Sequence, residues 1–236
     1  MLNQRTVLIP LKTDESVSVM MVSKLTHSLK LSYHQGKKSF ILSHPATLPD
    51  DMLFAFMEDH HDWLVETYSQ RPTEKIITIG DDFCFLGKKY VLQKDKLRRK
   101  GIFEDGNTIW VGSHLYEPAP LEKFLKQKAK VYLEEIAKDY AGRLGVSFEK
   151  LTVRDTSTRW GSCSSAKTLS FSWRLGFAPV EVTDYVVAHE VAHLLQMNHS
   201  PAFWRLVHGL CPQYKIHKKW LKKEGIDLVA VEFILD

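Results

Sequence analysis

The chain has 236 residues, of which 44% are hydrophobic and 25% are charged, and its formal net charge is +4. A globular chain of this size can bury a substantial core and can form two small domains. The small positive charge excludes the strongly basic composition of many nucleic-acid-binding proteins, and no apolar run has the length of a secretion signal or a membrane span.

The first part of the chain is typical of β-structure with one helix. Strands are predicted at 7–11, 16–22 and 39–44, because these segments are rich in residues that favour strands and are separated by polar turns. An amphipathic helix is predicted over 49–70. Hairpins are predicted at residues 76–80, 83–86 and 89–93, followed by 102–112. In the last of these segments, Asp105-Gly106 forms the turn.

The second part is mostly helical. A long helix is predicted over 120–143, with Pro120 in its first turn. A strand at 151–154, a loop at 155–167 and a strand at 168–175 precede helices over 180–197 and 201–209. Ser200 is the predicted N-cap of the last helix, and Pro201 is its first residue. We therefore expect an α+β fold with a β-rich N-terminal region over 1–115 and a second domain over 116–236.

The motif that points to chemistry is HEVAH at 189–193. The helical pitch places His189 and His193 one turn apart on one face, where both can bind a single Zn²⁺. Glu190 can then reach the open side of the metal and take a proton from water, which Zn²⁺ acidifies toward a pKa of ~7. The alternative is two core histidines with ordinary hydrogen bonds and an ion-paired Glu190. The apolar surroundings of the motif disfavour it, since polar groups there need a partner.

A catalytic zinc site needs a third protein ligand, and His199 is the candidate. A continuous helix cannot bring His199 to the same face, so we expect the chain to turn back between Leu195 and His199, with Asn198 as a left-handed helix terminator. The helix start at Ser200-Pro201 then holds His199 beside the first two histidines. The pattern predicts one zinc ion.

Longer motifs around this site resemble the YgjP-like family of zinc metallopeptidases, relatives of the WLM and SprT-like zincins. They are RWGSCSS (159–165), SWRL (172–175) and DYVVAHEVAHLLQMNHSPAFW (184–204), and the resemblance extends over nearly the whole chain. It implies a zincin-like catalytic domain that acts on a peptide or protein, with His189, His193 and His199 as ligands and Glu190 as the catalytic residue. The metzincin pattern has glycine where this chain has Gln196, so we do not expect a Met-turn at Met197.

Residues around the motif have less certain roles. Arg159 and Trp160 are candidates for substrate binding, with Arg159 binding an oxyanion, a carboxylate or a phosphate. The alternative is a stack of Arg159 on Trp160 that fixes the loop while Gly161 supplies a turn. Trp204 either lines a substrate pocket or packs one helix on another. Cys163 is interpreted as structural rather than nucleophilic.

Two other functions stay open at this stage. A nucleotide phosphoanhydride hydrolase would need Lys or Arg side chains converging on the metal. A nucleic-acid- or protein-binding module with structural zinc would need a closed site with four ligands. The basic run KDKLRRK (94–100) is either a contact for phosphates or a solvated surface.

The cysteines and the absence of targeting signals indicate the compartment. Cys84, Cys163 and Cys211 are far apart in the sequence and form no CxxC pair. This pattern suits a reducing environment, so we expect a cytoplasmic protein without a membrane association.

Overall fold

A computed structural model describes residues 4–11, 16–34, 39–69, 74–97, 100–156 and 158–235. Residue 70 at the end of the predicted helix, and Arg98 and Arg99 of the basic run, lie outside these ranges. The chain forms two compact units, Met1–Arg71 and Pro72–Asp236. In the described part of the chain, no helix has both the length and the apolar composition that a membrane span requires.

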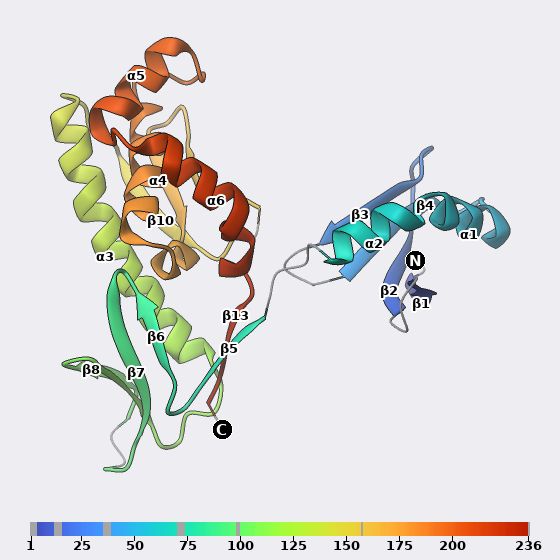
Figure 1. Cartoon of the computed structure of the whole chain (residues 1–236), viewed down its shortest axis with the longest axis horizontal. Coiled ribbons are helices and arrows are strands. Elements are labelled where there is room, and N and C mark those ends of the chain that lie inside the picture. The colour runs from blue at the N-terminus through green and yellow to red at the C-terminus, as the bar shows by residue number, and fades with distance from the viewer. Residues whose placement is uncertain are drawn as a thin grey trace. The chain divides into compact units, whose positions relative to one another are not determined.

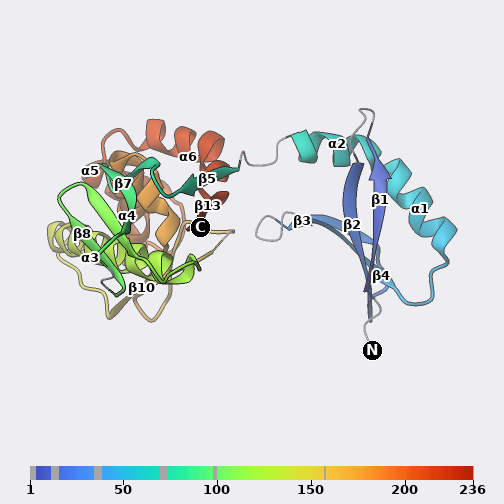
Figure 2. The same cartoon turned by 90° about the horizontal axis from the view of Figure 1, so that it is seen from below.

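The N-terminal unit is a four-stranded sheet with two helices on one side (Figure 2). Its strand order is β1-β2-β4-β3, in which β2 and β4 are parallel and the other neighbours antiparallel. Alternate residues of β2, such as Val19 and Met21, are fully buried and share a core with Leu53 and Met57 of the helices. The elements are β1 (Gln4–Pro10), β2 (Ser16–Lys24), β3 (Lys30–His34), β4 (Ser39–Pro45), α1 (Asp50–Asp59) and α2 (His61–Ser69).

Two predictions for this unit need correction. The helix predicted over 49–70 is two helices, because the chain turns at His60, whose ring Nδ1 lies 2.8 Å from the carbonyl oxygen of Phe56. Strand β3 was not predicted. Its sequence, KLSYH, contains only two large apolar or aromatic residues, and its pairing with β4 supplies the backbone hydrogen bonds that local sequence does not reveal.

The second unit combines two small sheets, a strand pair and four helices (Figure 1). The first sheet has the order β6-β7-β9-β8 and the second has the order β10-β12-β11. Its elements are β5 (Lys75–Thr78), β6 (Asp82–Phe85), β7 (Lys88–Asp95), β8 (Ile102–Asp105), β9 (Thr108–Gly112), α3 (Ala119–Arg143), β10 (Lys150–Arg154), β11 (Gly161–Cys163), β12 (Thr168–Ser172), a 3₁₀ turn (Trp173–Phe177), α4 (Val180–Ala192), α5 (Pro201–Leu210), α6 (Tyr214–Leu228) and β13 (Val231–Ile234).

One hydrophobic core joins both sheets and α3 to α4. Phe85 of β6 packs on Trp173 and Phe177, and the backbone N–H of Leu86 donates to the carbonyl oxygen of Gly176 at 2.6 Å. The chain therefore divides near residue 71, whereas the sequence suggests a boundary after residue 115. The reason is that the strands between residues 75 and 112 have no core of their own: Phe83, Leu92 and Ile109 share one core with α3 and α4. The mixture of helices and sheets, with a β-rich N-terminal part, is confirmed.

The layout of the second unit positions one helix for chemistry. Helix α4 packs between α3 and α6, and β11 lies against it. Nine of the thirteen residues of α4 are buried, including Val186, Val187 and Val191. Strand β11, which falls in the predicted loop over 155–167, pairs only with β12 among the described strands and is the edge of its sheet. Polar groups of α4 that face β11 are thus held in a rigid, largely apolar environment.

Candidate metal centre

Three histidines converge at the C-terminal end of α4. His189 and His193 come from α4 and the turn that follows it, and His199 precedes α5. One ring nitrogen from each lies within 4.8 Å of the other two, and the Nε2 atoms of His189 and His199 are 3.0 Å apart. No other group of three metal-ligating side chains occurs among the described residues.

The chain turns back earlier than the sequence suggests. Helix α4 ends at Ala192, whose carbonyl oxygen accepts hydrogen bonds from the backbone N–H groups of Leu195 and Gln196. The prediction of a helix to residue 197 with a left-handed Asn198 is wrong, because Asn198 has no positive φ. Its side-chain oxygen instead accepts from the backbone N–H of Ser200 at 3.3 Å. The chain therefore reverses through a tightened last turn and not through a left-handed residue at position 198.

A phenylalanine in the first turn of α5 packs against all three histidines. Ser200 is the N-cap, its Oγ accepting from the backbone N–H of Phe203 at 3.4 Å, and Pro201 follows it, as predicted. The ring of Phe203 is fully buried and lies 4.9, 4.5 and 4.8 Å from the rings of His189, His193 and His199. The sequence reveals the cap, but the contact of one ring with all three imidazoles follows only from the fold.

The protonation states suit metal binding. His193 Nδ1 lies 2.9 Å from the carbonyl oxygen of Gln196, and in the neutral ring this contact places the proton on Nδ1 and the lone pair on Nε2. Burial, together with the charges of His193 and His199, lowers the pKa of His189 to about 3. Burial likewise lowers the pKa of His199, with contributions from His193 and Lys218. Neutral imidazole is the form that binds metal ions, and three such donors suit zinc and other late first-row metals.

Glu190 lies beside this cluster in a space that only glycine can leave open. Its side chain is 6% exposed, and a Cβ on Gly161 of β11 would lie 2.6 Å from Glu190 Cγ and 2.7 Å from Oε1. Gly161 has no positive φ, so its role here is close approach and not the predicted turn. Burial raises the pKa of Glu190 to about 7, which is suitable for accepting and returning a proton near neutral pH.

The other candidate residues separate into two groups. Trp204 is near the histidines, its ring centroid 5.8 Å from those of His189 and His199. Trp160 instead packs against α6, where a Cβ on Gly225 would lie 3.4 Å from its ring. Arg159 is exposed, and its carbonyl oxygen accepts from Thr156 Oγ1 at 2.7 Å. The stack of Arg159 on Trp160, the alternative to substrate binding, is absent from the described contacts, and Arg159 forms no ion pair with a described residue.

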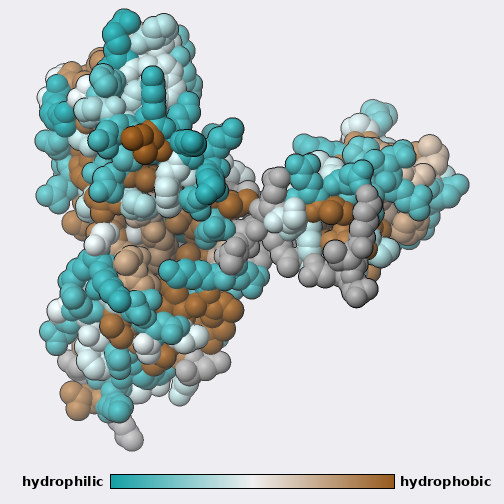
Figure 3. Space-filling view, viewed as in Figure 1, coloured by the Kyte–Doolittle hydropathy of each residue, from teal (hydrophilic) through white to brown (hydrophobic). Residues whose placement is uncertain are grey.

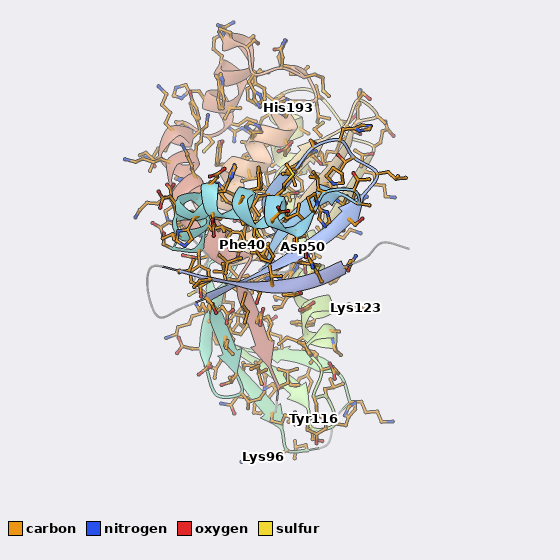
Figure 4. The ribbon with its side chains drawn as sticks, turned by 90° about the vertical axis from the view of Figure 1, so that its right-hand side faces the viewer. Phe40, Asp50, Lys96, Tyr116, Lys123 and His193 are labelled. Carbon is orange, nitrogen blue, oxygen red and sulfur yellow. The ribbon has the colours of Figure 1, made fainter. Side chains whose placement is uncertain are left out.

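Two further sequence features lie away from the chemistry. Burial and the nearby Glu190 charge raise the pKa of the Cys163 thiol to about 11, which agrees with its interpretation as non-nucleophilic. In the basic run, Lys94 donates to the carbonyl oxygens of Leu115 and Leu235, each at 2.7 Å. Lys96 lies at the opposite end of the second unit from His193 (Figure 4). The described part of this run therefore does not contact the histidine cluster.

Comparisons with known proteins identify the family. No curated protein matches the chain. Among solved structures, the metallopeptidase zymogen abylysin of Pyrococcus abyssi is 22% identical, covering 39% of this chain and 93% of its own, with a TM-score of 0.36. The zymogen jannalysin of Methanocaldococcus jannaschii is 19% identical, covering 38% of this chain and 95% of its own, with a TM-score of 0.32. These scores are too low to support an argument, but the family model for the YgjP-like metallopeptidase domain matches residues 27–224. The chain belongs to the YgjP-like family and contains its metallopeptidase domain.

Proposed function

We propose that this metallopeptidase is zinc-dependent, that His189, His193 and His199 hold one Zn²⁺, and that Glu190 is the general base. The observation that supports this most directly is the approach of three imidazole rings, with one nitrogen from each within 4.8 Å of the others, beside a buried carboxylate. Bound zinc would act as a Lewis acid that acidifies water and polarises the scissile carbonyl.

The residues of the chain then complete peptide hydrolysis. A carboxylate oxygen of Glu190 takes one proton from the attacking water as its oxygen bonds to the carbonyl carbon. Glu190 returns this proton to the nitrogen of the leaving amine as the C–N bond breaks. The apolar packing of α4 and the space at Gly161 hold the carboxylate in one orientation. This orientation lowers the cost of arranging the proton transfer.

The edge strand β11 is the proposed docking site for the peptide backbone. It contains Gly161 and lies against α4, so a peptide paired with it in an extended conformation passes the histidines. Arg159, immediately before the strand and exposed, is a candidate for a polar contact with such a peptide. Trp160 is a weaker candidate, because its ring packs against α6.

Two other readings have less support. Nucleotide hydrolysis would require several cations at the histidines, and the described residues bring only Lys218 within electrostatic reach of His189 and His199. A purely structural zinc would require a fourth protein ligand, whereas the described cluster has three. We further propose a cytoplasmic location, supported by the three free cysteines Cys84, Cys163 and Cys211.

The test combines metal analysis with substrate assays. The purified chain is analysed for metal, stripped with a chelator and reloaded with zinc, and each form is assayed on an unfolded protein, on peptides and on nucleoside triphosphates. We expect one zinc ion per chain and peptide cleavage that disappears with the metal and returns with zinc. Metal-dependent nucleotide hydrolysis without peptide cleavage would overturn the proposal.

A further inference from the structure

The segment that follows Glu190 has only positive charges. From Val191 to Lys223 the chain contains no Asp or Glu, and it contains six Lys and Arg residues. This segment forms α5, the turns around it and the first ten residues of α6, whose remaining part contains Glu224 and Asp227. Hydrophilic residues cover much of the end of the second unit where these helices lie (Figure 3). One side of the histidine cluster is therefore bordered by helices that attract anions.

A stack of rings connects this cationic region to the histidines. The Trp204 ring lies 5.8 Å from the His199 ring at 25° and 5.2 Å from the Tyr214 ring at 18°. Lys218 follows Tyr214 by one helical turn on α6, and its Nζ lies 4.4 Å from the centroid of Trp204. An ammonium group is thus held over the ring that contacts the candidate ligands.

The same ring forms a wall of a surface groove of about 820 Å³. Trp204 and Tyr214 give the groove an apolar surface, and Arg205, His208 and Lys215 supply polar and positive groups around it. Among the described residues, Arg205, Lys215 and Lys218 have no acidic ion-pair partner. Their charges are therefore available to a ligand. We refer to this surface, with Lys218, as the Trp204 groove.

We propose that the Trp204 groove is a specificity subsite that binds a carboxylate of the peptide substrate through Lys218. This inference rests on the proposed peptidase function. The groove shares Trp204 with the histidine cluster, so a bound carboxylate lies a few residues from the scissile bond. A lysine ammonium is a compact charge with three donors, which suits a single carboxylate, and the rings accept the methylene groups that precede it. The carboxylate belongs either to an Asp or Glu side chain or to the C-terminus of the peptide.

Binding is measured first in a Glu190→Gln background loaded with zinc, so that peptides are not consumed. Three labelled peptides have the same sequence except at one internal position. The first has Glu there and an amidated C-terminus, and the second has Gln and a free C-terminus. The third has Gln and an amidated C-terminus and is therefore the neutral peptide. We expect at least one carboxylate peptide to bind up to about fivefold more tightly than the neutral peptide. The stronger of the two identifies the source of the carboxylate.

The variant Lys218→Gln should abolish this preference without weakening binding of the neutral peptide. Lys219→Gln is the matched control, since Lys219 is an exposed neighbour on α6 and should keep the preference. Equal binding of all three peptides, or a preference that survives Lys218→Gln, would overturn the proposal. An oligodeoxythymidylate is tested as a competing anion. If Lys218→Gln weakens binding of this oligonucleotide but not of the carboxylate peptides, the proposal is also overturned.

Wild-type cleavage of the same peptides separates this inference from the proposed function. If the wild type cleaves all three peptides without a preference for a carboxylate, the proposed subsite is wrong and the proposed peptidase function stands. If the carboxylate peptides bind more tightly through Lys218 but no peptide is cleaved, carboxylate binding at the Trp204 groove is supported and the proposed peptidase function is wrong.

Discussion

Two clusters of partly or fully buried ionisable side chains in the second unit differ in whether an opposite charge offsets the effect of burial on their pKa values. At the end of α4, burial acts on groups without an opposite charge and shifts them toward their neutral forms: the pKa of His189 falls to about 3 and that of Glu190 rises to about 7. Near β8, burial also acts to raise the pKa of Glu104, but hydrogen bonds from Lys128 and Lys88 outweigh it and bring the pKa to about 2.

The difference separates a site for chemistry from a structural network. Glu104 Oε1 accepts from Lys88 Nζ at 2.9 Å and from the Tyr90 hydroxyl at 3.1 Å, and Lys128 donates to Oε2. This carboxylate is charged and paired, so it holds β7, β8 and α3 together. The carboxylate of Glu190, by contrast, can accept a proton, and the three histidines can bind a metal ion. In these two clusters, the groups without an opposite charge form the candidate site, and the paired groups stabilise the fold.

The largest expected effect comes from removing one histidine. His193→Ala should lower the affinity for the metal by more than about 100-fold, because loss of a ligand exceeds the effect of losing a supporting hydrogen bond. Metal content after dialysis and peptide cleavage measure it. His114→Ala, at an exposed position of the same unit, should change neither. Full metal occupancy in His193→Ala would show that this histidine is not a ligand.

Gly161→Ala tests how Glu190 is positioned. The new Cβ would displace the carboxyl group, whose Oε1 and Cδ lie 2.7 and 2.9 Å from that point, so cleavage should fall about 10- to 100-fold while the metal is retained. Gly142→Ala is the control, since Gly142 lies in α3 with open space around it. Unchanged cleavage by Gly161→Ala would mean that the Glu190 geometry is not needed.

Glu104→Gln should affect stability and not catalysis. Loss of the charge weakens the hydrogen bonds from Lys88 and Lys128, and we expect the free energy of unfolding to fall by about 1–2 kcal/mol at neutral pH. Chemical denaturation of both proteins, with peptide cleavage in parallel, makes the comparison. Loss of cleavage at unchanged stability would reverse the roles assigned to the two clusters.

The same pair of proteins gives a pH prediction. The folded pKa of Glu104 is about 2 and the ordinary value is 4.5, so its contribution is complete above pH 4.5 and is lost as the pH falls toward 2. The stability difference between wild type and Glu104→Gln should shrink over this range. A difference that stays constant down to pH 2 would contradict the assigned pKa.

The smallest effect is expected at the start of α5. Ser200→Ala removes the hydrogen bond from the Phe203 backbone N–H, and loss of an N-cap costs about 1 kcal/mol. Thermal unfolding measures it, with Ser200→Thr as a control that keeps the hydroxyl. Equal stability of the alanine and threonine variants would show that the cap contributes little.

Local patterns in the sequence predicted much of this arrangement. The HEVAH spacing, the Ser200-Pro201 helix start and the long helix α3 depend on neighbouring residues, so periodicity and capping rules apply to them directly. The role of Gly161 did not follow, because it depends on Glu190, which is distant in sequence. Trp160 and Trp204 show the same limit, because the sequence does not distinguish two aromatic residues near the motif. In the fold, Trp160 packs in a core with residues of α6, whereas Trp204 lies beside His199.

The most direct test of the central claim is the metal content and turnover of Glu190→Gln. The substitution keeps the shape of the side chain and removes its ability to accept a proton. We predict that the variant binds one zinc ion per chain, like the wild type, while kcat for peptide cleavage falls about 10²- to 10⁴-fold. Wild-type turnover by a zinc-loaded Glu190→Gln protein would contradict the assignment of Glu190 as the general base.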